Sequence, residues 1–239
     1  MNTFLFDLDG TLLPLDDKLF LKTYFDEMHK EFEDIIEKEQ LVKLIWTATD
    51  VMRCSQDNRT NMKTFMDKFK ELVSELGNDL SEYITRFDKF YDNGFMKVKK
   101  SASQNEYVIK SIELLKDKGY TVVVATNPLF PMKAVHHRIK WAGLNPEDFY
   151  YITSYENSHS CKPYISYYEE ILEFINKQPQ DCIMVGNDVQ EDLVASELGI
   201  KTFLIEDYII NRNEAEICCN YKGSYKDLYN YIEKLPSIK

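Results

Sequence analysis

Residues 4–11 read Phe-Leu-Phe-Asp-Leu-Asp-Gly-Thr, a short apolar run that ends in two acids, a glycine and a threonine. An uninterrupted apolar run of this kind is typical of a strand that is buried on both faces, as in a parallel sheet. Because residues two apart in an extended chain point the same way, we expect Asp7 and Asp9 to face one small volume. Gly10 then allows the chain to turn sharply. Taken alone, the pattern also fits a strand followed by an ordinary Asp-Gly turn.

Further short apolar runs and amphipathic stretches alternate along the rest of the chain. The runs predict strands at residues 121–125, 182–185 and 202–205. The stretches with apolar residues at helical spacing predict helices at residues 106–116, 132–142, 165–175 and 225–235. Alternation of helix and strand is typical of βαβ units. The sequence therefore predicts an α/β fold, with a three-layer, Rossmann-like core built on a parallel sheet.

Residues 15–95 have a different character. They contain no proline, 18 acidic and 12 basic residues, and apolar positions at helical spacing such as Phe65 and Phe69. This pattern predicts several helices packed on one another and inserted after the first strand. We therefore predict two domains, an α/β core domain of residues 1–14 and 96–239 and a helical cap domain of residues 15–95. The cap is expected to cover the carboxyl ends of the strands, and its aromatic residues are expected to be core residues.

Composition and charge exclude several classes of protein. The chain has 239 residues and a formal net charge of −11, with 44% apolar and 29% charged residues. Nucleic acids and anionic membranes require clustered Lys and Arg, so neither is expected as a partner. The five cysteines show no disulfide or zinc-site spacing, and the N-terminus lacks the features of a signal peptide. No apolar run approaches the length of a membrane span. We expect a cytoplasmic protein that is a monomer or a homodimer.

Three more polar clusters follow predicted strands or lie in loops, the regions where open parallel sheets bind ligands. Thr126-Asn127-Pro128 follows the second predicted strand, although Asn127 and Pro128 also suit the start of a helix. Lys162 stands before a proline, a pair with little specificity of its own. Residues 186–192 read Gly-Asn-Asp-Val-Gln-Glu-Asp. One of the two aspartates there can bind a metal while the other braces the loop or Lys162, and the same acids also suit a helix N-terminus.

The order of these clusters along the chain resembles the haloacid dehalogenase-like (HAD) hydrolase superfamily, phosphatase type, with a C1 helical cap. The matching positions are Asp7-x-Asp9-Gly10-Thr11 for its first motif, Thr126 for the second, Lys162 for the third, and Asp188 with Asp192 for the fourth. The resemblance covers nearly the whole chain. Its first motif is quite specific, and the ordered set is stronger than any single cluster.

The resemblance implies a hydrolase that cleaves a small phosphorylated metabolite, a phosphoric monoester, through an aspartyl-phosphate. Asp7 would attack phosphorus. Asp9 would protonate the leaving oxygen and then take a proton from the water that hydrolyses the intermediate. Lys162 would balance the negative charge, and Thr126 and Asn127 would bind phosphate oxygens.

The resemblance also implies a Mg²⁺ cofactor, because oxygen ligands and a phosphate suit this cation. Its protein ligands would be the Asp7 carboxylate, the Asp9 backbone carbonyl and the Asp188 carboxylate, with Asp192 bracing the loop. Many members carry an acid directly after the glycine of the fourth motif, where this chain has Asn187. Asp188 is therefore the predicted ligand from this loop.

Several alternatives stay open at this point. A sugar phosphomutase uses the same residues but returns the phosphoryl group to a sugar, and a binding or regulatory protein can keep the fold without turnover. A receiver-type signalling module also carries acids, a Thr and a Lys, but it needs only about half this length. Family members named for dehalogenation generally lack the second aspartate of the first motif, so Asp9 favours phosphate chemistry. Arg53, Arg59 and Arg86 of the predicted cap are candidate substrate contacts, although each also suits a surface ion pair.

Overall fold

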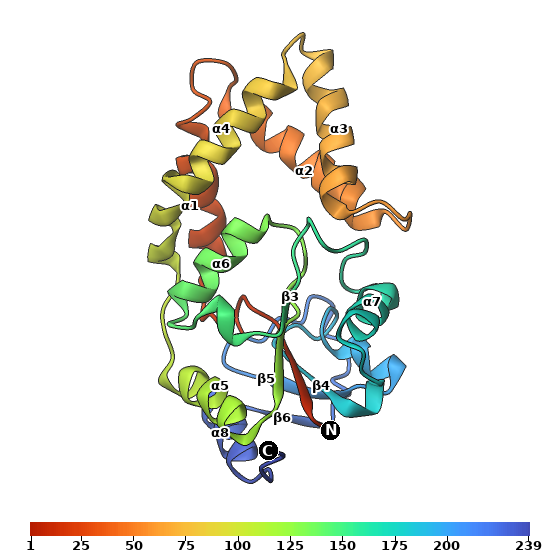
Figure 1. Ribbon diagram of the computed structural model, residues 1–239. Coiled ribbons are helices and arrows are strands. Elements are labelled where there is room, and N and C mark those ends of the chain that lie inside the picture. The colour runs from red at the N-terminus through yellow and green to blue at the C-terminus, as the bar shows by residue number, and fades with distance from the viewer.

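The computed structural model describes residues 1–239 and contains a single six-stranded parallel sheet (Figure 1). In their order across the sheet, the strands are β3 (Tyr151–Ile152), β2 (Thr121–Val124), β1 (Thr3–Phe6), β4 (Cys182–Gly186), β5 (Lys201–Ile205) and β6 (Tyr221–Gly223). β1 pairs with both β2 and β4, so that Phe6 lies beside Val124 and Val185. The segments that follow these three strands therefore meet at one edge of the sheet.

Alternate residues of the strands supply two hydrophobic clusters, one on each face of the sheet. On one face, Phe4 and Phe6 join a cluster with α5 (Glu106–Lys118), α6 (Met132–Trp141) and α8 (Tyr225–Glu233). On the other face, Leu5 and Val123 pack with residues of α7 (Ile165–Ile175) and η4 (Leu193–Leu198). Because side chains alternate along a strand, a sheet covered on both faces needs continuous apolar runs. The predicted three-layer, Rossmann-like α/β fold is confirmed.

The predicted strands and helices of the core are present, each with ends within about two residues of the predicted ones. Strands β3 and β6 were not predicted, because two or three residues are too few to form a recognisable apolar run. The suggestion that Asn127 and Pro128 begin a helix is wrong, because α6 begins at Met132. The residue before α6, Pro131, does not cap the helix with its side chain. The Glu156 carboxylate accepts a hydrogen bond from the Met132 N–H instead.

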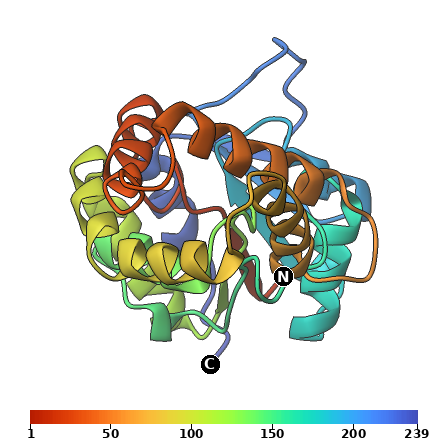
Figure 2. The ribbon, with the colours of Figure 1, turned by 90° about the horizontal axis from the view of Figure 1, so that it is seen from above.

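Helices fill the chain between β1 and α5, as the sequence predicts. They are α1 (Asp17–His29), α2 (Lys38–Cys54), α3 (Asn61–Glu75), α4 (Leu80–Asp92) and the 3-10 helix η1 (Gly94–Ser101). Figure 1 shows α1–α4 beyond the carboxyl ends of the strands, and the view from above in Figure 2 shows them lying over the core. We call residues 15–95 the cap, and its division from the core at these residues stays a prediction. The two segments that connect cap and core run side by side, where Leu15 forms an antiparallel bridge with Ala102.

An aromatic cluster joins the cap to the core. The Tyr24 ring of α1 packs edge-on against Phe95 and Phe130, with centroid distances of 6.1 and 5.6 Å. Phe95 in turn stacks on Trp141 of α6 at 5.0 Å. Tyr24, Phe95 and Trp141 belong to the same hydrophobic cluster as one face of the sheet. Phe69 of α3 is also fully buried in it, as expected for a core aromatic residue of the cap.

Two expectations from composition concern the cysteines and membranes. All five cysteines are free, and Cys161 and Cys182 are buried. Burial raises the pKa of the Cys182 thiol to about 11, which makes it a poor nucleophile. No helix combines the length and the apolar character that crossing a bilayer requires.

Candidate active site

The Lys162 ammonium lies between two carboxylates at the carboxyl edge of the sheet. Its Nζ donates hydrogen bonds to Asp7 Oδ1 at 2.9 Å and to Asp192 Oδ1 at 2.6 Å. The side chains of Lys162 and Asp192 are each 1% exposed. Asp7 follows β1, Asp192 follows β4, and Lys162 precedes α7. The structure thus brings together three predicted site residues that lie far apart in the sequence.

The charges of this triad depend on burial and on one another. Burial raises the pKa of Asp7 to about 6, and Lys162 opposes that rise through its charge and hydrogen bond. Burial likewise raises the pKa of Asp192, again against the effect of Lys162. Burial alone would lower the pKa of Lys162, but Asp192 and Asp7 outweigh it, so its pKa lies well above the ordinary value. Lys162 is therefore a fixed cation at neutral pH, and Asp7 is mostly ionised there.

Asp9 borders the same small pocket as Asp7, a cavity of about 130 Å³. Asp9 Oδ2 forms an ion pair with Nη1 of Arg138, a residue of α6 that is fully buried. The Arg138 guanidinium carbon lies 4.4 Å from the centroid of the Phe130 ring. Asp9 Oδ1, in contrast, has no hydrogen-bond partner. Arg138 therefore holds one oxygen of Asp9 in place, and the other oxygen is left without a partner.

Thr126 and Asn127 border this pocket from the end of β2. The Thr126 carbonyl accepts hydrogen bonds from Thr153 Oγ1 at 2.7 Å and from Tyr167 Oη at 2.8 Å. Asn127 Nδ2 donates to Glu191 Oε2 at 2.9 Å, and Asn127 Oδ1 is buried without a partner. These contacts fix the backbone at the end of β2, where Thr126 lines the same pocket as Asp7.

The loop after β4 explains why Asn187 stands next to the glycine. Asn187 Oδ1 accepts from Thr11 Oγ1 at 3.0 Å, and its Nδ2 donates to the Tyr208 carbonyl at 2.7 Å. Asn187 thus links its own loop to the loops that contain Thr11 and Tyr208. The first carboxylate after the glycine is therefore that of the next residue, Asp188. Gly10 is required by the same packing, because a Cβ there would lie 2.3 Å from Asn187 Nδ2. Asp188 Oδ1 also accepts from two backbone N–H groups of the following turn at 3.0 and 2.9 Å, but no helix begins there, because the 3-10 helix η4 starts only at Leu193.

The predicted magnesium ligands border one pocket and offer only oxygen donors. Asp7, Asp9 and Asp188 all line it, and such a donor set suits a hard cation. No group of three or more His, Cys, Asp or Glu side chains could hold a metal by itself. The predicted set differs from such a group, because Asp9 would contribute its backbone carbonyl. Asp188 Oδ2 pairs with Arg212 Nη1 at 2.6 Å, and a cation at Asp188 would displace this half-exposed guanidinium.

Sequence reasoning missed four charged residues that the fold brings to the pocket: Asp17, Arg138, Glu191 and Arg212. A signal for Arg138 exists, because an arginine three residues after Val135 lies on the apolar side of its helix. Glu191 lies inside the acidic loop already noted, and burial raises its pKa. Arg212 belongs to the long segment after β5 that extends outward in Figure 2. No local pattern there predicts a contact with Asp188.

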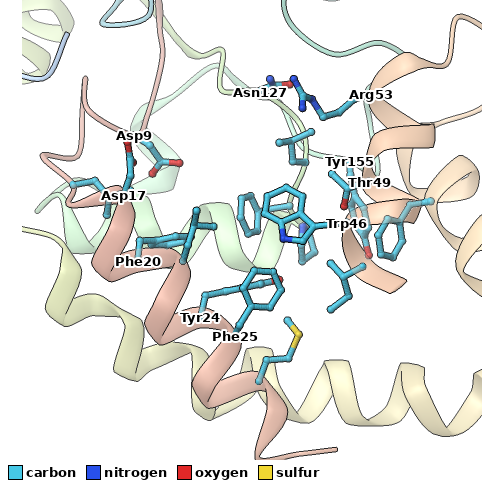
Figure 3. A pocket seen from close by; sticks show the side chains of 18 of the residues that line it. Asp9, Asp17, Phe20, Tyr24, Phe25, Trp46, Thr49, Arg53, Asn127 and Tyr155 are labelled. Atoms are coloured by element: carbon cyan, nitrogen blue, oxygen red, sulfur yellow. The ribbon is translucent and has the colours of Figure 1, made fainter. Parts of the chain in front are cut away.

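A second, larger cavity of about 450 Å³ adjoins this small pocket and is lined partly by residues of the cap. Both cavities are bordered by Asp9, Asp17 and Asn127. Arg53 of α2 also lines it, and Figure 3 shows its side chain beside Asn127. The two other candidate arginines of the cap form surface ion pairs instead, Arg59 with Asp57 and Asp67, and Arg86 with Asp34 and Glu82.

The family model described as haloacid dehalogenase-like hydrolase matches residues 1–198 of this chain. The chain belongs to the haloacid dehalogenase-like hydrolases. The match includes all four of the polar clusters that meet at the carboxyl edge of the sheet. This membership makes the protein a hydrolase and accounts for the arrangement of acids, threonine and lysine described above.

Curated relatives and solved structures agree with membership of this family. A protein named pyrophosphatase PpaX from Bacillus cereus is 21% identical over 202 residues, which cover 84% of this chain and 82% of the relative. The crystal structure of a HAD phosphatase from Thermococcus onnurineus matches with a TM-score of 0.60 at 18% identity, over 100% of both chains. The L-2-haloacid dehalogenase from Xanthobacter autotrophicus also reaches 0.60, at 11% identity over 98% of this chain and 99% of that one. The shared fold therefore serves two chemistries, and the site residues must distinguish them.

Proposed function

We propose that this hydrolase is a Mg²⁺-dependent phosphatase that cleaves a small phosphorylated metabolite, a phosphomonoester, through an aspartyl-phosphate. The proposal rests on one observation above all. The buried Lys162 ammonium holds Asp7 at 2.9 Å, while Asp7 and Asp9 both face one pocket at the carboxyl edge of the sheet. Such a pocket, with a fixed cation beside a carboxylate, suits an anionic substrate attacked by that carboxylate.

In the first half of the proposed reaction, an Asp7 carboxylate oxygen forms a bond to phosphorus as the bond between phosphorus and the ester oxygen breaks. The departing oxygen takes a proton from Asp9, so the alcohol leaves in neutral form. The geometry that supports this role is the ion pair of Asp9 Oδ2 with Arg138, which leaves Oδ1 without a partner. Arg138 would position Asp9, not contact the substrate.

In the second half, Asp9 takes a proton from water as the water oxygen attacks phosphorus and the bond to Asp7 breaks. The products are the free alcohol and inorganic phosphate, and both aspartates return to their starting states. Lys162 neutralises charge on Asp7 and on the phosphoryl group throughout. The Thr126 hydroxyl and Asn127 would bind phosphate oxygens from the end of β2, and Arg53 faces the same region from the cap.

Mg²⁺ would be held by the Asp7 and Asp188 carboxylates and the Asp9 backbone carbonyl. When bound, it would reduce repulsion between the acids and an anionic substrate and would polarise a phosphoryl oxygen. The all-oxygen donor set supports this choice. Asp9 itself separates phosphate chemistry from dehalogenation, because cleaving a carbon–halogen bond releases a halide that needs no proton.

The test is hydrolysis of a generic aryl phosphate by the purified protein with Mg²⁺. We expect phosphate release that EDTA abolishes and added Mg²⁺ restores. Asp7→Asn should reduce the rate to background, because an amide is not a nucleophile of this kind. Asp181→Asn is the matched control, since Asp181 lies at the opposite, amino end of β4. An Asp7→Asn variant that keeps most of the activity would refute the mechanism.

A further inference from the structure

The larger cavity between cap and core is mostly apolar. Of its 24 lining residues 16 are hydrophobic, and its volume of about 450 Å³ is that of a site for a whole small molecule. Figure 3 shows Phe20, Tyr24 and Phe25 of α1 on one side and Trp46 of α2 on the other. The rings of Phe25 and Trp46 are 6.0 Å apart.

Charged groups line only the end of this cavity that adjoins the catalytic pocket. Asp9, Asp17, Asn127, Glu191 and Arg212 border both spaces. Arg53 lies beside Asn127 in Figure 3, and is the one further charged residue of the lining. A phosphate group at Asp7 therefore leaves the rest of its molecule directed toward the aromatic end.

The aromatic end offers few hydrogen bonds to a ligand. The hydroxyls of Tyr24 and Tyr91 are engaged with each other at 2.7 Å. Most of the remaining lining consists of carbon and sulfur side chains such as Met28, Ile45 and Phe87, and the hydroxyls of Thr49 and Tyr155 lie near Trp46 (Figure 3). A sugar, a carboxylate or a second phosphate would lose its hydration there and find few hydrogen-bonding groups to replace it, which costs free energy. An apolar ring would gain by leaving water.

We propose that the substrate is the phosphomonoester of an apolar, ring-bearing alcohol, whose ring occupies the cavity between α1 and α2. This assignment rests on the proposed phosphatase function and narrows its substrate class. The proposed substrate differs from pyrophosphate, the compound in the name of the relative PpaX, because pyrophosphate has no apolar part. A sugar fits this cavity less well than an apolar ring, because most of the lining is hydrophobic.

The test compares four compounds with Mg²⁺: ethyl phosphate, 2-phenylethyl phosphate, 2-phosphoglycolate and pyrophosphate. The first two release primary alcohols and differ chiefly by a phenyl ring, so their ratio of kcat/KM measures how the ring is bound. We expect 2-phenylethyl phosphate to exceed ethyl phosphate by about 30-fold or more, the gain from burying a ring of this size. The two strongly polar compounds should be poorer still.

Two variants on the same helix locate the effect. Trp46→Ala should lower the ratio of 2-phenylethyl to ethyl phosphate at least about fivefold, since it removes a wall of the cavity. Val51→Ala is the matched control, because Val51 is exposed and lies outside the cavity lining, and it should leave the ratio unchanged. Using the ratio cancels any loss of folded protein in either variant.

Binding can be followed without turnover by 2-phenylethylphosphonate, which has no ester oxygen to cleave. It should change the tryptophan fluorescence of the wild type, and Trp46→Phe should remove that signal, because Trp141 is buried against Phe95. A kcat/KM ratio of 2-phenylethyl to ethyl phosphate near one, or a preference for phosphoglycolate or pyrophosphate, would overturn the substrate assignment but not the proposed phosphatase function. Release of phosphate from none of the four compounds would overturn the proposed function, and the assignment with it.

Discussion

The guanidinium of Arg138, fully buried in α6, forms an ion pair with the Asp9 carboxylate, and both residues line the small pocket at the carboxyl edge of the sheet. The pair joins the helix after β2 to the loop after β1, two segments that lie far apart in the sequence. Arg138 is also stacked on Phe130, which prevents it from swinging away. The position of Asp9 is therefore set by a buried residue from a different part of the chain.

Replacing Arg138 with Met should remove the ion pair that holds Asp9, while the methionine side chain still fills the buried space beside α6. We expect kcat to fall about 10- to 100-fold, because a proton-transferring group that is not held in place loses much of its benefit. Unfolding in urea should show a loss of about 1–3 kcal/mol, below that for a fully buried pair because Asp9 is partly exposed. Lys140→Met, on the exposed side of the same helix, is the control. A kcat within twofold of wild type would show that Asp9 needs no such support.

Gly186→Ala should damage the site from the end of β4. A Cβ at Gly186 would lie 2.0 Å from Asp192 Oδ2, so Asp192 must move away from Lys162. We expect kcat to fall at least tenfold and the free energy of unfolding to fall by about 1–3 kcal/mol, the usual cost of overpacking.

Gly77→Ala provides the contrast for this variant. Gly77 lies in an exposed turn of the cap with a φ of +76° and no atom within 4 Å of an added Cβ. Its substitution should cost about 1–2 kcal/mol through backbone strain and leave kcat unchanged. Equal losses of kcat in the two variants would rule out a specific effect on Asp192.

The stability of the metal-free protein should decrease as pH rises from about 4 to about 7. Burial raises the pKa of Asp192 to about 7 and that of Asp7 to about 6, so the folded state binds these protons more tightly than the unfolded state. Their contribution is complete below the ordinary aspartate pKa and is lost as pH passes through the raised values. Lys162 titrates well above this window and does not alter it.

Thermal unfolding in EDTA at several pH values measures this effect. The Tm should fall by several degrees across the window, because about 1 kcal/mol corresponds to about 2–4 °C for a chain of this size. Asp192→Asn should flatten the fall, whereas Asp181→Asn should retain it. A Tm that rises from pH 4 to pH 7 in the wild type would contradict the sign of this prediction.

Arg212→Gln should strengthen the binding of Mg²⁺. Arg212 pairs with Asp188 Oδ2 at 2.6 Å, the carboxylate proposed as a metal ligand, so the guanidinium and the metal compete. Its side chain is 50% exposed, and an exposed ion pair is worth about 1 kcal/mol at most, so the Kd should fall about two- to fivefold. Calorimetric titration without substrate measures this change. Arg59→Gln is the control, because Arg59 forms a surface ion pair of the cap, and it should leave the Kd for Mg²⁺ unchanged. A higher Kd in Arg212→Gln than in the wild type would exclude competition.

The sequence by itself determined the class of fold and the candidate site residues. Continuous apolar runs require strands covered on both faces, and amphipathic stretches between them require helices, so the layers follow from local pattern. The spacing of Asp7 and Asp9 places both acids on one side of an extended chain for the same local reason. The short strands β3 and β6 escaped prediction because their pairing comes from neighbouring strands and not from their own few residues.

Only the tertiary structure decided which distant charges meet and which surface of the cap faces the site. Lys162 contacts Asp7 and Asp192 across 155 and 30 residues of chain, and Arg138 contacts Asp9 across 129. Such pairs leave no local pattern, because long-range contacts depend on how whole elements pack. The same holds for the aromatic residues of the cap, since helical spacing predicts that Phe69 and Phe87 are both buried but not that Phe87 also borders a cavity.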